Sequence, residues 1–192
     1  MSSDLKNYPK VSVIIPTYNR CDVLQRSLGL LFDQDYPKDK IEICVIDDGS
    51  TDETKQVIES IKVPTGIKLV YLANVHKGPA AARNKGILQA SGSVVLIIND
   101  DTFATRTLIS EHVKFHNQFP TDNFAVLGLI AWDKDIPTTA FMKWLEHKGP
   151  LFSYYRIQGI YANWRHAWTC NISYKRDFLI KEGLFDEDFP YA

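Results

Sequence analysis

The chain has 192 residues, 45% of them hydrophobic, and its 22 basic and 23 acidic residues leave a formal net charge of -1. This composition supports a globular core of ordinary size, and the balanced charge disfavours a nucleic-acid-binding protein. No apolar run approaches the roughly 18 residues of a membrane span, and the start MSSDLKNYPK lacks the apolar core of a signal peptide. Three widely spaced cysteines, Cys21, Cys44 and Cys170, favour reduced thiols. We therefore expect a soluble, cytoplasmic protein.

Strand and helix patterns alternate along the first 130 residues. Apolar, largely β-branched runs predict strands at 11–15, 41–46, 67–72, 93–98 and 124–130. Helical spacing of apolar residues predicts helices around 23–31, 57–61, 79–91 and 106–118. We interpret Asp22 as the cap of the first helix and the pair Ser50 and Glu53 as a capping box for the second. Pro79 indicates the start of the third helix.

This alternation predicts an α/β fold, a Rossmann-like sandwich with a mainly parallel central sheet and helices on both faces. The pattern changes after residue 131, because 13 of the 23 aromatic residues lie between Phe141 and Tyr191. The segment 138–146 predicts a short amphipathic helix. We expect one structural domain with two parts, 1–131 and 132–192.

Polar residues gather where the predicted strands end. In a doubly wound sheet, ligands bind outside the carboxyl ends of the strands, so these residues are the informative ones. They are Pro16 to Arg20 after the first strand, Asp47 and Asp48 after the second, Asn74, His76, Lys77 and Arg83 after the third, and Asn99, Asp100 and Asp101 after the fourth. Four such ends on one edge predict a cleft for a polar, negatively charged small molecule.

Two common phosphate-binding motifs are absent. The sequence has no G-x-G-x-x-G after the first strand and no G-x-x-x-x-G-K-[ST], which disfavours an NAD(P)-dependent oxidoreductase and a P-loop protein. A divalent cation at Asp101 would neutralise a bound phosphate instead, because oxygen ligands suit Mg²⁺ and Mn²⁺. The alternative for Asp100 and Asp101 is a solvated acidic turn.

Five segments resemble, in the family's order, the family 2 glycosyltransferases of the GT-A fold. They are VSVIIPTYNR, IEICVIDDGSTDET, HKGPAAARNKGI, VVLIINDDT and, more loosely, WTCNISYKRDFLIKEGLFDEDF. Together they cover most of 11–102 and 168–189. The resemblance implies binding of a nucleoside-diphosphate sugar, by default a UDP-sugar, with 1–131 as the donor-binding half and 132–192 on the acceptor side.

The resemblance also implies a role for each matching position. Pro16 and Tyr18 would lie against the base and ribose, Asp48, with Asp47 as a second candidate, would hydrogen-bond the base, and Arg83 would lie near the base or phosphates. Asn99, Asp100 and Asp101 occupy the place of the D-x-D motif, in which Asp101 would bind Mn²⁺ or Mg²⁺. The family usually has Asp where this chain has Asn99, whose oxygen still accepts a hydrogen bond from a ribose hydroxyl, so we expect altered donor affinity. The implied donor-binding residues are Pro16, Tyr18, Asp47, Asp48, Arg83, Asn99 and Asp100, with Asp101 as the metal ligand.

The implied reaction is an inverting transfer of the sugar to an acceptor hydroxyl. In the family an acidic pair that supplies the catalytic base follows the FDE segment, whereas this sequence ends FDEDFPYA. The expected base therefore lies beyond Ala192, and Asp186, Glu187 and Asp188 precede its position. The alternatives are a non-catalytic nucleotide-sugar-binding module and an inactive fragment of a longer glycosyltransferase.

The histidine pair and the aromatic residues of the C-terminal part each allow two interpretations. His112 and His116 have a spacing that could bind zinc, but the Glu of H-E-x-x-H is missing, which favours an ordinary helix face. Tyr154, Tyr155, Tyr161, Trp164 and Trp168 either stack on an acceptor sugar or fill a core. The acceptor implied by the resemblance is a saccharide or a lipid-linked molecule, the latter giving a peripheral position at the inner membrane face. The donor sugar, the linkage and the oligomeric state are not encoded in any motif.

Overall fold

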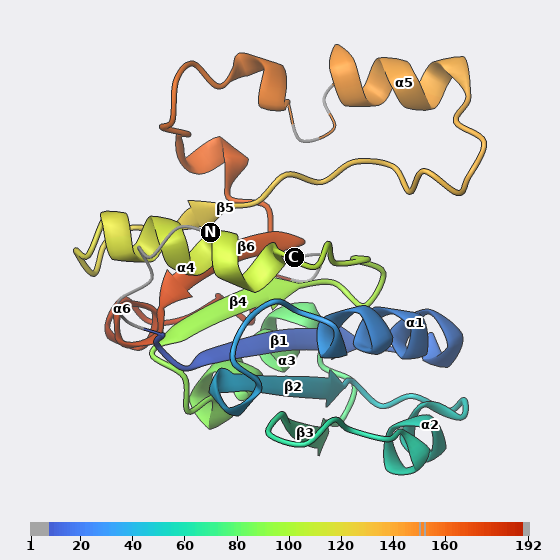
Figure 1. Ribbon diagram of the computed structural model, residues 1–192. Coiled ribbons are helices and arrows are strands. Elements are labelled where there is room, and N and C mark those ends of the chain that lie inside the picture. Colours follow the sequence, from blue (N-terminus) through green and yellow to red (C-terminus); the bar gives the residue numbers. More distant parts are fainter. Residues whose placement is uncertain (1–7, 150, 152, 190–192) are drawn as a thin grey trace.

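The computed structural model describes residues 8–149, 151 and 153–189. Residues 1–7 and 190–192 lie outside this described part. The expectation that the chain start lacks a signal peptide falls mostly on residues 1–7. A mixed six-stranded sheet with the order β3-β2-β1-β4-β6-β5 forms its centre (Figure 1). The strands are β1 Val11–Thr17, β2 Ile41–Asp47, β3 Lys68–Ala73, β4 Val94–Ile98, β5 Val126–Leu127 and β6 Asn171–Lys175. Strands β1 to β4 pair in parallel and β6 pairs antiparallel with β4, which confirms the mainly parallel sheet.

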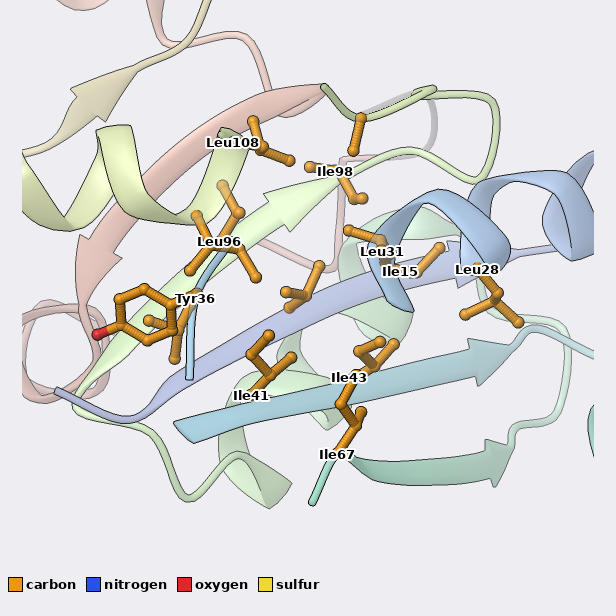
Figure 2. Packing of buried hydrophobic residues seen from close by; sticks show 14 of the residues in the cluster. Ile15, Leu28, Leu31, Tyr36, Ile41, Ile43, Ile67, Leu96, Ile98 and Leu108 are labelled. Carbon is orange, nitrogen blue, oxygen red and sulfur yellow. The ribbon is translucent and has the colours of Figure 1, made fainter. Parts of the chain in front are cut away.

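Helices cover both faces of the sheet, as predicted. One apolar cluster joins β1, β2 and β4 to α1 and α4, and a second joins the opposite face to α3 and α6 (Figure 2 shows part of the first). The helices are α1 Cys21–Phe32, α2 Thr54–Ser60, α3 Pro79–Gln89, α4 Leu108–Gln118, α5 Ala140–His147 and α6 Arg176–Lys181. Short 3-10 helices lie at Lys38–Lys40, Tyr154–Arg156 and Trp164–His166.

Alternate residues of the central strands enter the two clusters. Val13 and Ile15 face α1, whereas Ile14 faces α3, and all three are fully buried. Helix α3 lies very close to the sheet at Gly86, where an added Cβ would be 2.6 Å from Ile46 Cδ1 and 2.7 Å from Ile14 Cγ2. This close approach fixes the start of α3 above the carboxyl ends of β1 and β2.

The predicted cap of the first helix is wrong. Helix α1 begins at Cys21, so Asp22 lies inside its first turn instead of before it. The N–H of Cys21 donates instead to Asp52 Oδ2 at 3.1 Å. A carboxylate from the loop after β2 therefore takes the place that local sequence suggested for Asp22.

The predicted capping box of the second helix is also wrong. Helix α2 begins at Thr54, and Glu53 precedes it without a side-chain cap. Ser50 Oγ accepts a hydrogen bond from the Asn19 N–H at 2.9 Å, while Asp52 Oδ1 accepts one from the Thr54 N–H at 3.1 Å. Contact between the loops after β1 and β2 thus removes Ser50 from the helix end.

The predicted strand at 124–130 is much shorter than expected. Only Val126 and Leu127 pair as β5, and they pair antiparallel with β6, a strand that the sequence patterns did not predict. The Gly128 N–H still donates to the Asn171 carbonyl at 2.9 Å, but the Asn171 side chain then donates to the Leu129 carbonyl at 3.1 Å. This side chain takes over from the backbone ladder and ends the strand.

The described residues of the segment 132–167, which are 132–149, 151 and 153–167, extend past the β5 edge of the sheet and include the predicted helix α5 (Figure 1). None of the residues of α5 is buried. Arg26 of α1 reaches this segment through an ion pair with Asp133 at 2.8 Å, and Tyr154 Oη donates to the Gly128 carbonyl at 3.1 Å. Among the described residues, no helix combines the length and the apolar character that crossing a bilayer requires.

His112 and His116 lie on the face of α4 that packs against the sheet, as the helix-face interpretation predicts. Both are almost fully buried. His112 Nδ1 is 2.7 Å from Ser173 Oγ, and His112 Nε2 is 2.9 Å from Asn171 Oδ1. His116 Nε2 lies 2.8 Å from the same Ser173 oxygen. The two imidazoles therefore join α4 to β6.

These buried histidines should make stability depend on pH. Burial lowers the pKa of His112 and of His116 from 6.5 to about 4, so both are neutral in the fold at pH values where the unfolded chain binds protons. Their contribution is fully present above pH 6.5 and is lost as the pH falls toward 4. We expect the free energy of unfolding, measured by urea denaturation, to fall in that window by up to about 1.4 kcal/mol per pH unit for each histidine.

His116→Gln should reduce the slope of the unfolding free energy against pH by the contribution of one bound proton, up to about 1.4 kcal/mol per pH unit. The matched control is His147→Gln on the exposed surface of α5, which should leave the slope of the wild type. Equal slopes for His116→Gln and the wild type would contradict the assignment.

Candidate functional site

The parallel strands bring the predicted polar residues to one edge of the sheet. Asp47, Asp48 and Asp100 are each only 4% exposed there, whereas Tyr18 and Asp101 are open to solvent. The adjacent residues Asp100 and Asp101 therefore differ strongly in burial. The buried carboxylates must have hydrogen-bond partners within the protein, while the exposed one is accessible to a ligand.

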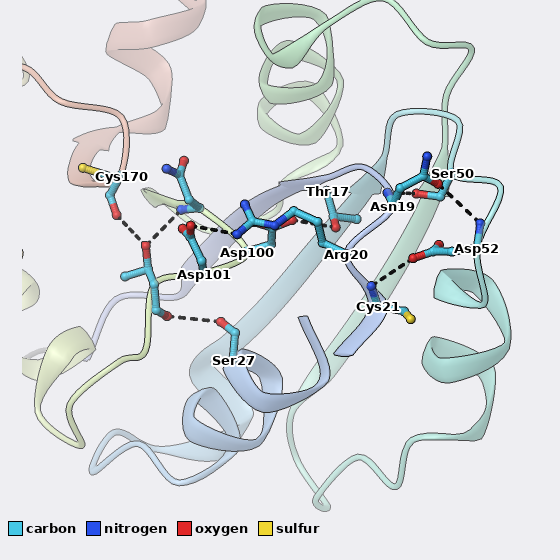
Figure 3. A network of polar contacts seen from close by, with 12 residues as sticks. Thr17, Asn19, Arg20, Cys21, Ser27, Ser50, Asp52, Asp100, Asp101 and Cys170 are labelled. Atoms are coloured by element: carbon cyan, nitrogen blue, oxygen red, sulfur yellow. Dashed lines mark hydrogen bonds and ion pairs between the residues drawn. The ribbon is translucent and has the colours of Figure 1, made fainter. Parts of the chain in front are cut away.

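The loop after β1 is fastened to the loop after β2 by Asn19 (Figure 3). Asn19 has a φ of 53°, a left-handed conformation that asparagine tolerates better than most residues. Its Oδ1 accepts hydrogen bonds from the N–H of Thr51 at 2.7 Å and of Asp52 at 3.3 Å. This clamp places the neighbouring side chains of Tyr18 and Arg20 at the sheet edge.

Asp100 and Asp101 share one cation from the protein itself. Arg20 Nη1 donates to Asp100 Oδ1 and Arg20 Nη2 donates to Asp101 Oδ2, each at 2.9 Å (Figure 3). Thr17 Oγ1 also donates to Asp100 at 2.9 Å. Burial raises the pKa of Asp100, although Thr17 and Arg20 oppose this shift. The pair is therefore not a purely solvated turn, because a guanidinium group balances the two carboxylates.

Asp48 organises the turn that precedes α3. Its carboxylate accepts hydrogen bonds from the N–H of Lys77 at 3.0 Å and of Gly78 at 2.8 Å, and His76 Nδ1 lies 3.0 Å from Asp48 Oδ2. The His76 ring stacks on Tyr18, with 4.4 Å between the ring centroids. The two residues predicted to contact a base are thus linked through His76.

Asp47 is used inside the loop that follows β2. Its Oδ1 accepts a hydrogen bond from the Ser50 N–H at 2.7 Å, and its Oδ2 accepts one from Tyr71 Oη at 2.6 Å. Because both oxygens have partners, Asp47 fixes the shape of this loop. Burial and the contact with Asp47 raise the pKa of Tyr71, so its hydroxyl keeps the donated proton.

Arg83 is a buried cation that is incompletely paired in the described part of the chain. It is 6% exposed on α3, and within the described ranges its Nε has no hydrogen-bond partner and no carboxylate pairs with it. Its guanidinium carbon lies 5.8 Å from the centre of the Phe185 ring. Burial lowers the pKa of Arg83. A buried, incompletely satisfied guanidinium is costly, so a ligand with negative charge would relieve it.

Cys170, immediately before β6, lies within electrostatic reach of two charged residues of the edge. Burial raises the pKa of its thiol, with the charge of Asp101 adding to the shift and that of Arg83 opposing it. Both charged groups are thus within electrostatic range of this thiol. The Cys170 carbonyl also accepts a hydrogen bond from Thr102 Oγ1 at 3.0 Å, which ties β6 to the turn after β4.

The remaining predicted residues lie at the same edge. Pro16 and Asn99 are half-buried near the ends of β1 and β4. The Asn99 N–H donates to Thr102 Oγ1 at 3.3 Å, and the Asn99 carbonyl accepts from the Thr102 N–H at 3.1 Å. These backbone contacts shape the acidic turn and leave the Asn99 side chain outside that hydrogen bonding.

The carboxylate oxygens of Asp101 and Asp100 fit a hard divalent cation, because the geometry already accommodates a positive charge between them. No cluster of three or more His, Cys, Asp or Glu side chains in the described part of the chain could enclose a metal ion. A site with one or two carboxylates is typical of Mg²⁺, which takes its remaining ligands from water and substrate phosphates.

Several contacts of this edge were not predicted from the sequence. The roles of Thr17 and Arg20 as partners of Asp100 were missed, although both belong to the loop that the sequence marked as polar. Cys170 was missed because β6 itself was not predicted. Glu187, which we did not assign as the base, accepts a hydrogen bond from Asn84 Nδ2 at 2.8 Å, so α3 holds it in place.

A separate apolar cavity of about 560 Å³ lies between α4, β5 and the segment 154–167. Tyr154, Tyr161 and Trp164 line it, together with Phe119 and Phe124. None of the predicted donor-site residues contributes to its lining. The stacking role of these aromatic residues on an acceptor therefore stays a prediction.

Comparison with known proteins supports the resemblance. The model of the family described as glycosyl transferase family 2 matches residues 12–183. A validoxylamine A glucosyltransferase of Streptomyces hygroscopicus is 28% identical over an alignment of 211 positions, which covers 98% of this chain and 50% of that protein. The poly(ribitol-phosphate) beta-N-acetylglucosaminyltransferase TarS of Staphylococcus aureus is 34% identical over 113 residues, 59% of this chain and 20% of TarS. The chain thus spans half or less of these relatives.

Solved structures show the same architecture. A mannosyltransferase from Pyrobaculum calidifontis, in complex with GDP-Man and Mn²⁺, is 26% identical with a TM-score of 0.71 over 97% of this chain and 50% of that one. TarS 1–349 from S. aureus in complex with UDP-GlcNAc is 25% identical with a TM-score of 0.70, covering 92% of this chain and 48% of that one. These likenesses confirm the predicted GT-A type fold.

Proposed function

Because the chain belongs to glycosyl transferase family 2, we propose that the carboxyl edge of its sheet binds a nucleoside-diphosphate sugar. The proposed reaction is an inverting, metal-assisted transfer of that sugar to an acceptor hydroxyl. The observation that carries the proposal is the buried guanidinium of Arg83, whose Nε has no hydrogen-bond partner among the described residues, together with the exposed carboxylate of Asp101, since both charges act on the same thiol of Cys170. A diphosphate bound to a divalent cation offers the negative charge that Arg83 lacks and the positive charge that Asp101 attracts.

Each side chain of the edge has a place in this proposal. Asp101, supported by Asp100, would hold Mn²⁺ or Mg²⁺, which supplies stabilisation of the negative charge on the departing nucleoside diphosphate. Arg83 would donate to the phosphates, and Tyr18 would stack on the base. The remaining proposed contacts are Asp48 and Asp47 near the base, Asn99 at the ribose and Pro16 beneath the nucleotide.

The donor and acceptor classes are drawn from the relatives. UDP-GlcNAc and GDP-Man are the nucleotide sugars in the two similar structures, and we propose a UDP-sugar. Another relative from Campylobacter jejuni, 42% identical over 94 residues, is named for a lipid-linked acceptor, GalNAc(5)-diNAcBac-PP-undecaprenol. A saccharide or lipid-linked hydroxyl is accordingly the proposed acceptor, approached from 132–192, with 1–131 as the donor half. A lipid-linked acceptor would place the protein peripherally at the inner membrane face.

Thermal unfolding with UDP, GDP, dTDP and CDP, each with and without Mn²⁺, tests the proposed donor site. A ligand at about 100 times its dissociation constant stabilises the native state by about 2.7 kcal/mol, which gives a clear increase in melting temperature. We expect the largest increase with UDP and Mn²⁺ together. No increase with any nucleotide would contradict the proposal.

A second candidate is a module that binds a nucleotide sugar without catalysing transfer. It is favoured by the contact of Glu187 with Asn84 of α3, which engages this carboxylate in a structural hydrogen bond at 2.8 Å. Sugar transfer to any acceptor by the 192-residue chain, detected with a radiolabelled donor, would exclude this candidate.

A further inference from the structure

Arg20 provides a positive charge at the place proposed for the metal ion. Its two terminal nitrogens donate to Asp100 Oδ1 and Asp101 Oδ2, each at 2.9 Å. The Arg20 side chain is 45% exposed and that of Asp101 is 47% exposed, whereas that of Asp100 is 5% exposed. The guanidinium group thus approaches the acidic pair from the solvent side, the side from which a metal ion and a diphosphate would arrive.

The backbone around Arg20 is held more firmly than its side chain. The Asn19 side chain bonds the loop after β2, and the Cys21 N–H donates to Asp52. The backbone of Arg20 is therefore held in place, while its half-exposed side chain can rotate about its own bonds. The guanidinium group can leave Asp101 without any change in the fold.

A metal ion and the Arg20 guanidinium compete for Asp101. A divalent cation bound to Asp101 would repel a guanidinium group on the same carboxylate, and the repulsion is strong at such short distances. The displaced guanidinium needs a new anion, and the incoming diphosphate provides one, since arginine binds phosphate oxygens well. Metal without nucleotide offers no such replacement.

We propose that Arg20 is a positioning residue that couples metal binding to nucleotide binding. Arg20 occupies the acidic pair in the free protein, opposes binding of the metal ion alone, and moves onto the diphosphate when metal and nucleotide arrive together. This inference rests on the proposed function. It explains why an acidic pair with one exposed member, Asp101, can stay selective for the metal–nucleotide complex over free metal ions.

The test is the affinity for Mn²⁺, measured by electron paramagnetic resonance of the free ion, with and without UDP. Arg20→Gln should bind Mn²⁺ alone about tenfold more tightly than the wild type, because a competing positive charge is gone. The factor by which UDP tightens Mn²⁺ binding should fall by about tenfold, because the variant also lacks the phosphate contact. A residue that merely supports the carboxylates would instead weaken Mn²⁺ binding when it is removed.

Arg26→Gln is the matched control. Arg26 is also a half-exposed arginine of this region, but its guanidinium pairs with Asp133 at 2.8 Å and lies over the Phe103 ring at 3.9 Å, and in the described part of the chain it forms no ion pair with Asp100 or Asp101. It should bind Mn²⁺ like the wild type. Arg20→Lys gives an independent variant: a lysine cannot bridge both carboxylates as the guanidinium does, so Mn²⁺ alone should bind more tightly than in the wild type but less tightly than in Arg20→Gln.

Unchanged or weaker binding of Mn²⁺ alone in both Arg20 variants would overturn the inference while leaving the donor site intact. If the wild type shows no Mn²⁺ binding even with UDP, the proposed function fails, and this inference fails with it. The two failures are therefore distinguishable in the same titrations.

Discussion

Asp101→Ala should abolish the metal-dependent part of nucleotide binding. In the wild type we expect UDP at about 100 times its dissociation constant to add about 2.7 kcal/mol in the presence of Mn²⁺, and nearly all of this should be lost in the variant. The physical reason is that Asp101 is the exposed carboxylate of the acidic pair. Calorimetric unfolding of both proteins, with and without Mn²⁺ and UDP, measures the effect.

The same substitution should cost the free protein little stability. Asp101 is 47% exposed and its ion pair is with a half-exposed arginine, and such pairs contribute at most about 1 kcal/mol. Asp135→Ala is a suitable control, because Asp135 is exposed and also lies near an arginine, Arg26 at 3.5 Å. It should retain the full response to UDP and Mn²⁺. A full response in Asp101→Ala as well would remove Asp101 from the metal site.

Arg83→Met should change stability and binding in opposite directions. Methionine keeps much of the length of the side chain but removes a buried charge whose Nε has no partner within the described residues. Relief of such a group is worth about 1–3 kcal/mol, so the free protein should become more stable toward urea. Nucleotide binding should weaken by about a hundredfold, because a charge-assisted bond to phosphate contributes roughly that much.

Arg176→Met is the control for this substitution. Arg176 also packs against α3, but its Nε donates to the Ile87 carbonyl at 3.0 Å and its Nη2 to the Leu88 carbonyl at 2.9 Å. The control should therefore lose stability and retain nucleotide affinity. If Arg83→Met were destabilised like the control and bound UDP normally, Arg83 would be a structural residue.

The two predictions address different halves of one site. Asp101 contributes the exposed negative charge and Arg83 contributes the buried positive charge, and both act on the thiol of Cys170. A protein selected for stability alone would pair these charges with each other or remove them. The incomplete pairing of the buried Arg83 lowers the stability of the free protein, and a bound anionic ligand can offset this loss, which is a common property of functional sites.

The acidic turn after β4 shows how far sequence reasoning extends. The run Val94–Ile98 followed by Asn99, Asp100 and Asp101 was sufficient to place carboxylates at the end of a buried strand. It was not sufficient to show that Asp100 is buried while Asp101 is exposed. Adjacent residues of a turn point in different directions, and their burial depends on Thr17 and Arg20, which lie 83 and 80 positions before Asp100.

At the helix ends, local sequence patterns predicted the wrong capping residues. Asp22 and Ser50 were assigned as caps because they precede helical patterns, which is a local rule. In the structure Asp52 accepts the Cys21 N–H, and Asn19 bonds to Ser50. A side chain from a neighbouring loop satisfied the helix end better than the local one, and this alternative exists only once β1 and β2 lie side by side.

By itself the sequence determined the α/β layers, the parallel strands β1 to β4 and the polar edge, because apolar periodicity and the turn residues that interrupt it are local signals. Only the tertiary structure decided that β6 lies between β4 and β5, that Arg20 bridges Asp100 and Asp101, and that the buried Arg83 has an Nε without a partner in the described part of the chain. Each of these depends on segments distant in the chain, and their pairing is fixed by packing and hydrogen bonding across the whole sheet, which no local pattern encodes.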